Sequence, residues 1–140
     1  MVGLGPGCSV RRARDVASVF IVDDSALIRE SLKLYLCDIA NLALAGEAGS
    51  AQTAIAAIEI QVPDCVILDF QLRDGTALDI LRVLRPSFPE IEFLIFSSHA
   101  SQQLRDACKQ AGASSFFDKA TEIDAMLGVI TTIASRKTGC

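Results

Sequence analysis

Three features are missing from this sequence, and each absence excludes a class of protein. No apolar run approaches the ~20 residues needed to cross a bilayer, so no membrane-spanning segment is expected. The five cysteines (Cys8, Cys37, Cys65, Cys108 and Cys140) include no C-x-x-C pair, so neither a zinc site nor a disulfide framework is indicated. Basic residues form no concentrated face and the net charge is -4, which argues against nucleic acid as the main ligand.

The chain has 140 residues and no composition break long enough for a linker, so one domain with one core is expected. Residues 1–17 hold glycine, proline and three arginines but lack the continuous apolar stretch of a secretory signal. We therefore expect a flexible N-terminal tail over 1–17, a folded domain over 18–136 and a short C-terminal tail over 137–140. Reduced cysteines, with Cys65 as part of the core, fit a cytoplasmic protein.

Short β-branched or aromatic runs alternate with stretches of helical spacing. Five strands are expected, at 19–22, 42–48, 65–68, 93–96 and 114–117. Apolar residues recur at helical intervals between and after them, which predicts five helices around 28–39, 54–58, 78–84, 104–111 and 123–133, with Tyr35 on the apolar face of the first. Ser50, Ser101 and Thr121 stand where N-caps are wanted, and Gly112 where a helix ends.

These strands are apolar throughout and do not alternate with polar residues, which is typical of a parallel sheet covered on both faces. Five strand–helix units in this length predict an α/β fold, a doubly wound domain with a five-stranded parallel sheet. In such sheets, ligands bind at the carboxyl ends of the strands.

Polar residues follow four of the five predicted strands. They are Asp23 and Asp24 after the first, Asp69 after the third, Ser97 after the fourth and Lys119 after the fifth. Each one alone is typical of a turn, a cap or a solvated position. Five of them at one edge of a sheet indicate a site.

Three carboxylates within reach of one another repel unless a cation neutralises them. Mg²⁺, or Mn²⁺ in its place, suits a set of hard oxygen ligands that also holds a phosphate oxygen. Asp69 is then a candidate nucleophile for phosphoryl transfer, with Lys119 and Ser97 contacting the phosphoryl oxygens. The same repulsion predicts that removing any one of the three aspartates raises stability when no metal is bound.

With these residues in place, the chain over about 18–136 resembles the receiver domain of two-component response regulators. The stretches "DFQLRDGTALDIL" and "SSFFDKATEID" are most similar to the LuxR/NarL-type subgroup. The resemblance implies the flavodoxin-like strand order 2-1-3-4-5. It also implies phosphorylation of Asp69 by a histidine kinase or a phosphotransfer protein. The receiver would catalyse only this transfer and its own dephosphorylation, so we do not expect an enzyme acting on other substrates.

The resemblance further assigns roles to individual residues. Asp24 is the direct metal ligand, Asp23 acts through water, and the backbone carbonyl of Gln71 completes the protein's ligands. Lys119 is the family's lysine, Ser97 and Phe116 occupy its two switch positions, and Phe117 belongs to the core. Gln71 and His99 are candidate modulators of dephosphorylation, and for His99 a solvated loop position is an equal alternative.

Three residues depart from the usual receiver pattern. Arg73 and Ala77 stand where proline and glycine are usual, and Ala120 replaces the proline that often follows the lysine. No cis peptide bond is therefore expected after Lys119. The shape of the loop after Asp69, and with it the lifetime of the phosphoryl group, is left open.

Other functions fit the residues less well. A haloacid-dehalogenase-type phosphatase carries D-x-D after its first strand, whereas this chain has D-D, and a flavodoxin would not place two acids in its phosphate loop. A receiver-like interaction module that works without phosphorylation is the main alternative. The sequence ends at "SRKTGC" with no helix-turn-helix, so we expect a single-domain protein that acts through a partner or a second copy bound at 101–135 and contacts neither nucleic acid nor membrane.

Overall fold

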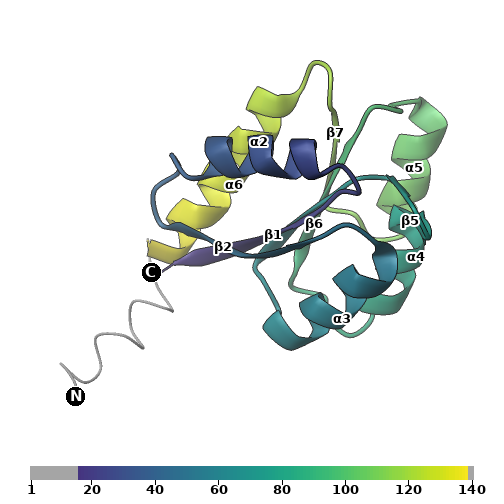
Figure 1. The fold of residues 1–140 in the computed structure, drawn as a ribbon, viewed down its shortest axis with the longest axis horizontal. Coiled ribbons are helices and arrows are strands. Elements are labelled where there is room, and N and C mark those ends of the chain that lie inside the picture. The colour runs from purple at the N-terminus through teal and green to yellow at the C-terminus, as the bar shows by residue number, and fades with distance from the viewer. Residues whose placement is uncertain (1–15, 139–140) are drawn as a thin grey trace.

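A central sheet of five parallel strands organises the protein. The computed structural model describes residues 16–138, so most of the predicted N-terminal tail, Cys8 and Cys140 lie outside the described residues. The strands are β1 (Ala17–Val22), β2 (Leu42–Ala48), β3 (Cys65–Leu68), β6 (Glu92–Ser97) and β7 (Ser115–Asp118), in the spatial order β2-β1-β3-β6-β7 (Figure 1). Counted along the chain this is 2-1-3-4-5, so the predicted strands and their order are confirmed.

Helices cover both faces of this sheet. They are α2 (Ala26–Leu36), α3 (Ala51–Gln61), α4 (Ala77–Leu84), α5 (Gln102–Gln110) and α6 (Ile123–Thr138). On one face lie α2 and α6, and on the other α3, α4 and α5 (Figure 1). Within residues 16–138, no helix is both long enough and apolar enough to span a membrane.

Each face of the sheet has its own hydrophobic core because successive strand residues point to opposite sides. Phe20, Val66 and Phe93 pack toward α3, α4 and α5, whereas Ile21 and Ile67 pack toward α2 and α6. Cys65 is fully buried, and burial raises the pKa of its thiol to about 12, which confirms it as a core residue. Phe117 is also in the core, as predicted.

The ends of the helices agree with the sequence pattern at most positions. The hydroxyls of Ser50 and Ser101 accept the backbone N–H groups of Thr53 and Leu104, so both predicted N-caps are confirmed. Gly112 has φ +109, the left-handed conformation that glycine tolerates after a helix. The Thr121 cap was wrong, because α6 begins at Ile123 and Glu122 precedes it.

Two local features differ from the sequence pattern. Tyr35 is 51% exposed, because the core contacts of α2 are made by Leu32 and Leu36. An unpredicted antiparallel pair, β4 (Gln71–Leu72) with β5 (Gly75–Thr76), folds the chain between β3 and α4. Both strands have two residues, too short for any periodicity to reveal.

Candidate functional site

The predicted polar residues meet at the carboxyl edge of the sheet because the ends of its strands lie side by side. The backbone N–H of Asp69 donates to the carbonyl of Val22 at 2.9 Å, which aligns the ends of β3 and β1. The N–H of Lys119 donates to the carbonyl of Ser97, also at 2.9 Å, which aligns the ends of β7 and β6. Residues separated by up to 96 positions in the sequence thus form one site.

Lys119 joins two of the three aspartates. Its ammonium nitrogen lies 2.8 Å from Oδ2 of Asp23 and 3.2 Å from Oδ2 of Asp69. Both carboxylates are buried, with residue exposures of 2% for Asp23 and 8% for Asp69. A buried carboxylate needs a charged partner or several hydrogen bonds, and Lys119 is the charge that both share.

The three aspartates have carboxylate oxygens within 4.8 Å of one another. Asp23 is engaged at both oxygens, because Oδ1 accepts the backbone N–H of Ser25 at 2.9 Å and Oδ2 binds Lys119. Asp24 is exposed, and within the described part of the chain its carboxylate has neither an ion pair nor a hydrogen bond. Hard oxygen donors at this spacing fit Mg²⁺, with the oxygens of Asp24 the most available for direct binding.

The pKa values reflect burial competing with charge pairing. Burial raises the pKa of Asp69 above its ordinary value, and the nearby charge of Lys119 opposes that shift without cancelling it. For Lys119, burial favours the neutral amine, but the hydrogen bond to Asp23 and the charge of Asp69 outweigh it, so the pKa is raised. Lys119 is therefore a cation at neutral pH, as a group that contacts phosphoryl oxygens must be.

Ser97 ends β6, His99 lies in the loop after it, and Gln71 begins β4. Ser97 is buried at the end of β6, and its hydroxyl accepts the backbone N–H of His99 at 3.1 Å. His99 is exposed in the loop that follows. Gln71, also exposed, lies in β4 two residues after Asp69, and its carbonyl as a metal ligand stays a prediction.

Phe116 lies on β7, on the face of the sheet covered by α5. It is half-buried, and the guanidinium of Arg105 lies 4.9 Å from the centre of its ring. Arg105 also donates to the carbonyl of Phe116 at 3.5 Å and to the carboxylate of Glu122 at 3.1 Å. This arginine was not among the predicted site residues, since nothing in its helical spacing distinguishes it from a solvated residue.

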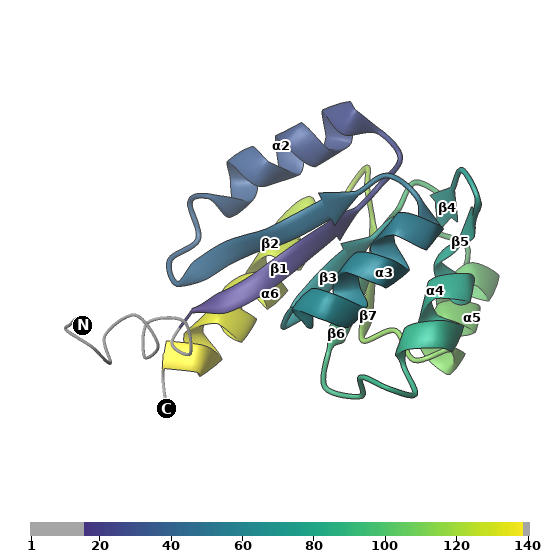
Figure 2. The same ribbon diagram turned by 60° about the horizontal axis from the view of Figure 1, so that its bottom comes forward.

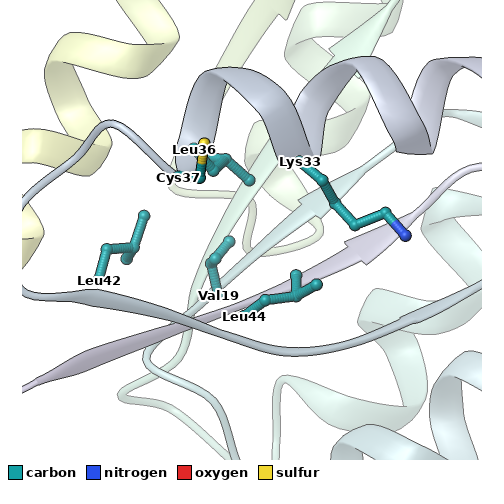
Figure 3. A pocket seen from close by; sticks show the side chains of 6 residues that line it. All are labelled: Val19, Lys33, Leu36, Cys37, Leu42 and Leu44. Atoms are coloured by element: carbon teal, nitrogen blue, oxygen red, sulfur yellow. The ribbon is translucent and has the colours of Figure 1, made fainter.

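A separate hollow lies between α2 and β2, away from the acidic site (Figure 3). Its volume is about 350 Å³, and Val19, Leu36, Leu42 and Leu44 supply apolar walls, as Figure 3 shows. Lys33 lies at its border, where its ammonium pairs with Glu30 and Glu47. None of the predicted site residues lines it.

Comparison with known proteins agrees with this arrangement. Residues 19–131 match the sequence model of the response regulator receiver domain. The chain is 34% identical over 104 residues to the DNA-binding transcriptional activator DevR/DosR of Mycobacterium tuberculosis, covering 74% of this chain and 48% of that protein. It is 37% identical over 97 residues to a protein-glutamate methylesterase/protein-glutamine glutaminase of Anaeromyxobacter dehalogenans, covering 69% of this chain and 25% of that protein. The chain thus spans about half the length of the first relative and a quarter of the second.

Solved structures share the fold. A LuxR-family two-component response regulator from Aurantimonas sp. SI85-9A1 superposes with a TM-score of 0.80 at 24% identity, covering 86% of each chain. The signal receiver domain of a Luxo repressor protein from Vibrio parahaemolyticus superposes with a TM-score of 0.78, also at 24% identity, covering 87% of this chain and 92% of that one.

Proposed function

The chain belongs to the response regulator receiver family, whose general function is to accept a phosphoryl group in two-component signalling, and on that premise we propose that Asp69 is its phosphoacceptor. The observation that carries the proposal is the ion pair between Lys119 and the buried carboxylate of Asp69, beside two further aspartates. A buried carboxylate next to a cation and a metal-binding cluster suits attack on a phosphoryl group.

In the proposed reaction, an oxygen of Asp69 forms a bond to phosphorus as the phosphorus–nitrogen bond of a phosphohistidine breaks. The imidazole leaves with that electron pair, and the phosphoryl group becomes an acyl phosphate on Asp69. The receiver would catalyse this transfer itself, with Lys119 and Ser97 holding the oxygens of the transferred group. In support, Lys119 lies 3.2 Å from Oδ2 of Asp69, and Ser97 ends β6, the strand paired with β3. Mg²⁺, or Mn²⁺, bound mainly by Asp24 would supply further positive charge at those oxygens.

The signal would reach partners through the surface over residues 101–135. Receivers in this family interact with histidine kinases and output domains. Movement of the Ser97 hydroxyl toward the phosphoryl group would break its bond with the His99 N–H and leave space for Phe116 to turn inward. Residues 101–135 would then form the surface that an output protein or a second copy binds.

The test is phosphorylation by acetyl phosphate with Mg²⁺, followed by intact mass and mapping of the acyl phosphate. Wild-type protein should gain one phosphoryl group. Chelating the Mg²⁺ before the donor is added should prevent this labelling. Asp69→Asn should gain none while keeping its melting transition, because the amide preserves size and removes the nucleophile.

A matched control is Asp38→Asn, which changes an exposed aspartate just after α2. It should be labelled like the wild type. Labelling of Asp69→Asn at another aspartate would reject the assignment, and no labelling of any variant would favour a phosphorylation-independent interaction module.

A further inference from the structure

The loop after Asp69 carries a positive charge that the proposed function does not use. Arg73 is exposed between β4 and β5, where receivers usually have proline. Within residues 16–138, its guanidinium has no hydrogen bond and no close ion pair, and its charge acts on the carboxyl of Asp74 beside it. Asp74 beside it already accepts the backbone N–H groups of Ala51 and Gln52, which are the main reason that the pKa of its carboxyl is lowered.

Arg73 lies close to a second arginine. A Cβ built on Gly49 would be 3.2 Å from Nη1 of Arg29 and 3.9 Å from Nη2 of Arg73, so both guanidinium groups lie beside this glycine. Gly49 directly follows β2, whose last carbonyl, that of Ala48, accepts the backbone N–H of Asp23 at 3.1 Å. Arg29 and Arg73, the arginine pair, therefore border the acidic site at the carboxyl edge of the sheet.

The fold holds Arg73 in this position. The carboxylate of Asp74 accepts the Ala51 N–H at 2.7 Å, which attaches the loop to the first turn of α3. On the other side, the N–H of Thr76 donates to Asp79 at 2.9 Å, which attaches the loop to the start of α4. Figure 2 shows β4 and β5 at the edge toward which the arrowheads of β1 and β2 point. The loop is thus anchored at both ends beside the site.

Two guanidinium groups beside the same glycine carry like charges, which repel unless anions offset them. Arg29 is offset by Glu47, whose carboxylate lies 2.8 Å from its Nε, and it also donates to the backbone carbonyl of Asp23. Arg73 has only its neighbour Asp74, whose oxygens are committed to α3. An incoming anion would therefore find one guanidinium already positioned by its neighbours and another with all its donors available.

We propose that the arginine pair is a docking site for the phosphoryl group of the donor, which it holds beside the acidic site before transfer to Asp69. The inference rests on the proposed function, because it deepens the role of the same site. A phosphoryl donor approaching three aspartates is repelled by them, and Lys119 is committed to Asp23 and Asp69. Cations at the border of the site would raise the local concentration of donor and speed its capture.

All of these donors carry the same phosphoryl oxygens, which the arginine pair would bind. Two donors with different leaving groups therefore show which class of donor the pair serves. With acetyl phosphate, a phosphorus–oxygen bond breaks and acetate leaves. With phosphoimidazole, a phosphorus–nitrogen bond breaks and imidazole leaves, as with phosphohistidine. In both reactions, an oxygen of Asp69 forms the new bond to phosphorus, so the same protein atoms act in each measurement.

The experiment measures the second-order rate constant for labelling of Asp69 by each donor, with saturating Mg²⁺, over a series of salt concentrations. Arg73→Ala should lower it at least about threefold at low salt, and the difference should vanish at about 1 M salt, where the Debye length is near 3 Å. Arg73→Lys should keep most of the rate, because attraction needs charge more than geometry. Slowing with only one donor would assign the pair to that class of donor.

The matched control is Arg136→Ala, which removes a guanidinium paired with Glu92 at the start of β6, the opposite edge of the sheet. It should leave the rate unchanged at every salt concentration. The inference is overturned if Arg73→Ala labels at the wild-type rate with both donors, if its loss persists at high salt, or if Arg73→Lys is as slow as Arg73→Ala. Failure of the proposed function looks different, because the wild type itself would then lack label at Asp69.

Discussion

Lys119 lies closer to Asp23 than to Asp69, at 2.8 Å against 3.2 Å between its nitrogen and the nearest carboxylate oxygen. Lys119 would contact a phosphoryl group on Asp69, yet in this structure its shorter ion pair is with Asp23, an aspartate of the metal cluster. Asp23 and Asp69 depend on the same cation, and Asp24 does not. The three acids should therefore respond differently to mutation.

Mg²⁺ affinity should separate Asp24 from Asp23. Asp24→Ala should weaken binding by at least about tenfold, because its oxygens are available for direct coordination, and Asp23→Ala by less, because both of its oxygens already have partners. Calorimetric titration suits the measurement, since the chain has no tryptophan and its one tyrosine is Tyr35 on α2. Asp38→Ala is the control, and equal affinities for the Asp23 and Asp24 variants would contradict the distinction.

The contacts of Asp23 change the expectation that removing any one of the three aspartates raises stability without metal. A gain is now expected for Asp69 and a loss for Asp23. Asp69→Asn should raise the free energy of unfolding at neutral pH by about 1 kcal/mol, because it removes a charge whose burial is incompletely offset. Asp23→Ala should lower it by about 2 kcal/mol, because it removes the acceptor of the Ser25 N–H and a partner of Lys119. Urea unfolding measures both. A gain for both variants would show that repulsion dominates these contacts.

The gain from Asp69→Asn should depend on pH. The folded-state pKa of Asp69 is raised, so protonation favours the folded protein and the ionised carboxylate lowers its stability. That loss is complete above the raised pKa and disappears as the pH falls through it and below the ordinary value of 3.8. Unfolding curves of both proteins should therefore differ most near neutral pH and converge at acid pH, and a gap that widens on acidification would oppose this sign.

Lys119→Met should destabilise the metal-free protein by about 2–3 kcal/mol, because two buried carboxylates then lack their shared cation. The pKa of Lys119 is raised, so its contribution is complete below the ordinary value of 10.5 and is lost only as the pH rises through the higher folded-state value. Chemical unfolding from neutral to alkaline pH tests this window. Combining Lys119→Met with Asp69→Asn should recover part of the loss, and strict additivity would argue against the shared cation.

Arg105 should control the position of Phe116. Arg105→Ala removes the guanidinium over the ring and should lower the free energy of unfolding by about 0.5–1 kcal/mol. It should also move amide resonances across 101–135 toward their positions in wild-type protein with Mg²⁺ and beryllofluoride, because the ring is freed to turn inward. Gln102→Ala, one turn earlier on α5, is the control. Shifts limited to the immediate neighbours of residue 105 would leave the arginine with no part in the switch.

The sequence by itself determined the layers of this protein and the edge at which its site lies. Apolar strands of four to seven residues and helical stripes are local patterns, and the topology of parallel strands puts the residues after each strand at one edge. Asp23, Asp24, Asp69, Ser97 and Lys119 could therefore be chosen from spacing and from a family resemblance.

Only the tertiary structure decided which of these residues touch, because their contacts depend on the register between strands that are far apart in the chain. The spacing does not predict that Lys119 lies closer to Asp23 than to Asp69, or that Arg105 lies over Phe116. It also does not predict that Glu122, and not Thr121, precedes the last helix. The placement of the Arg29 and Arg73 guanidinium groups beside Gly49 is of the same kind. Arg29 comes from α2 and Arg73 from the turn between β4 and β5, which Asp74 anchors to α3. Side-chain contacts of this range follow from packing and long-range hydrogen bonds, which no local pattern encodes.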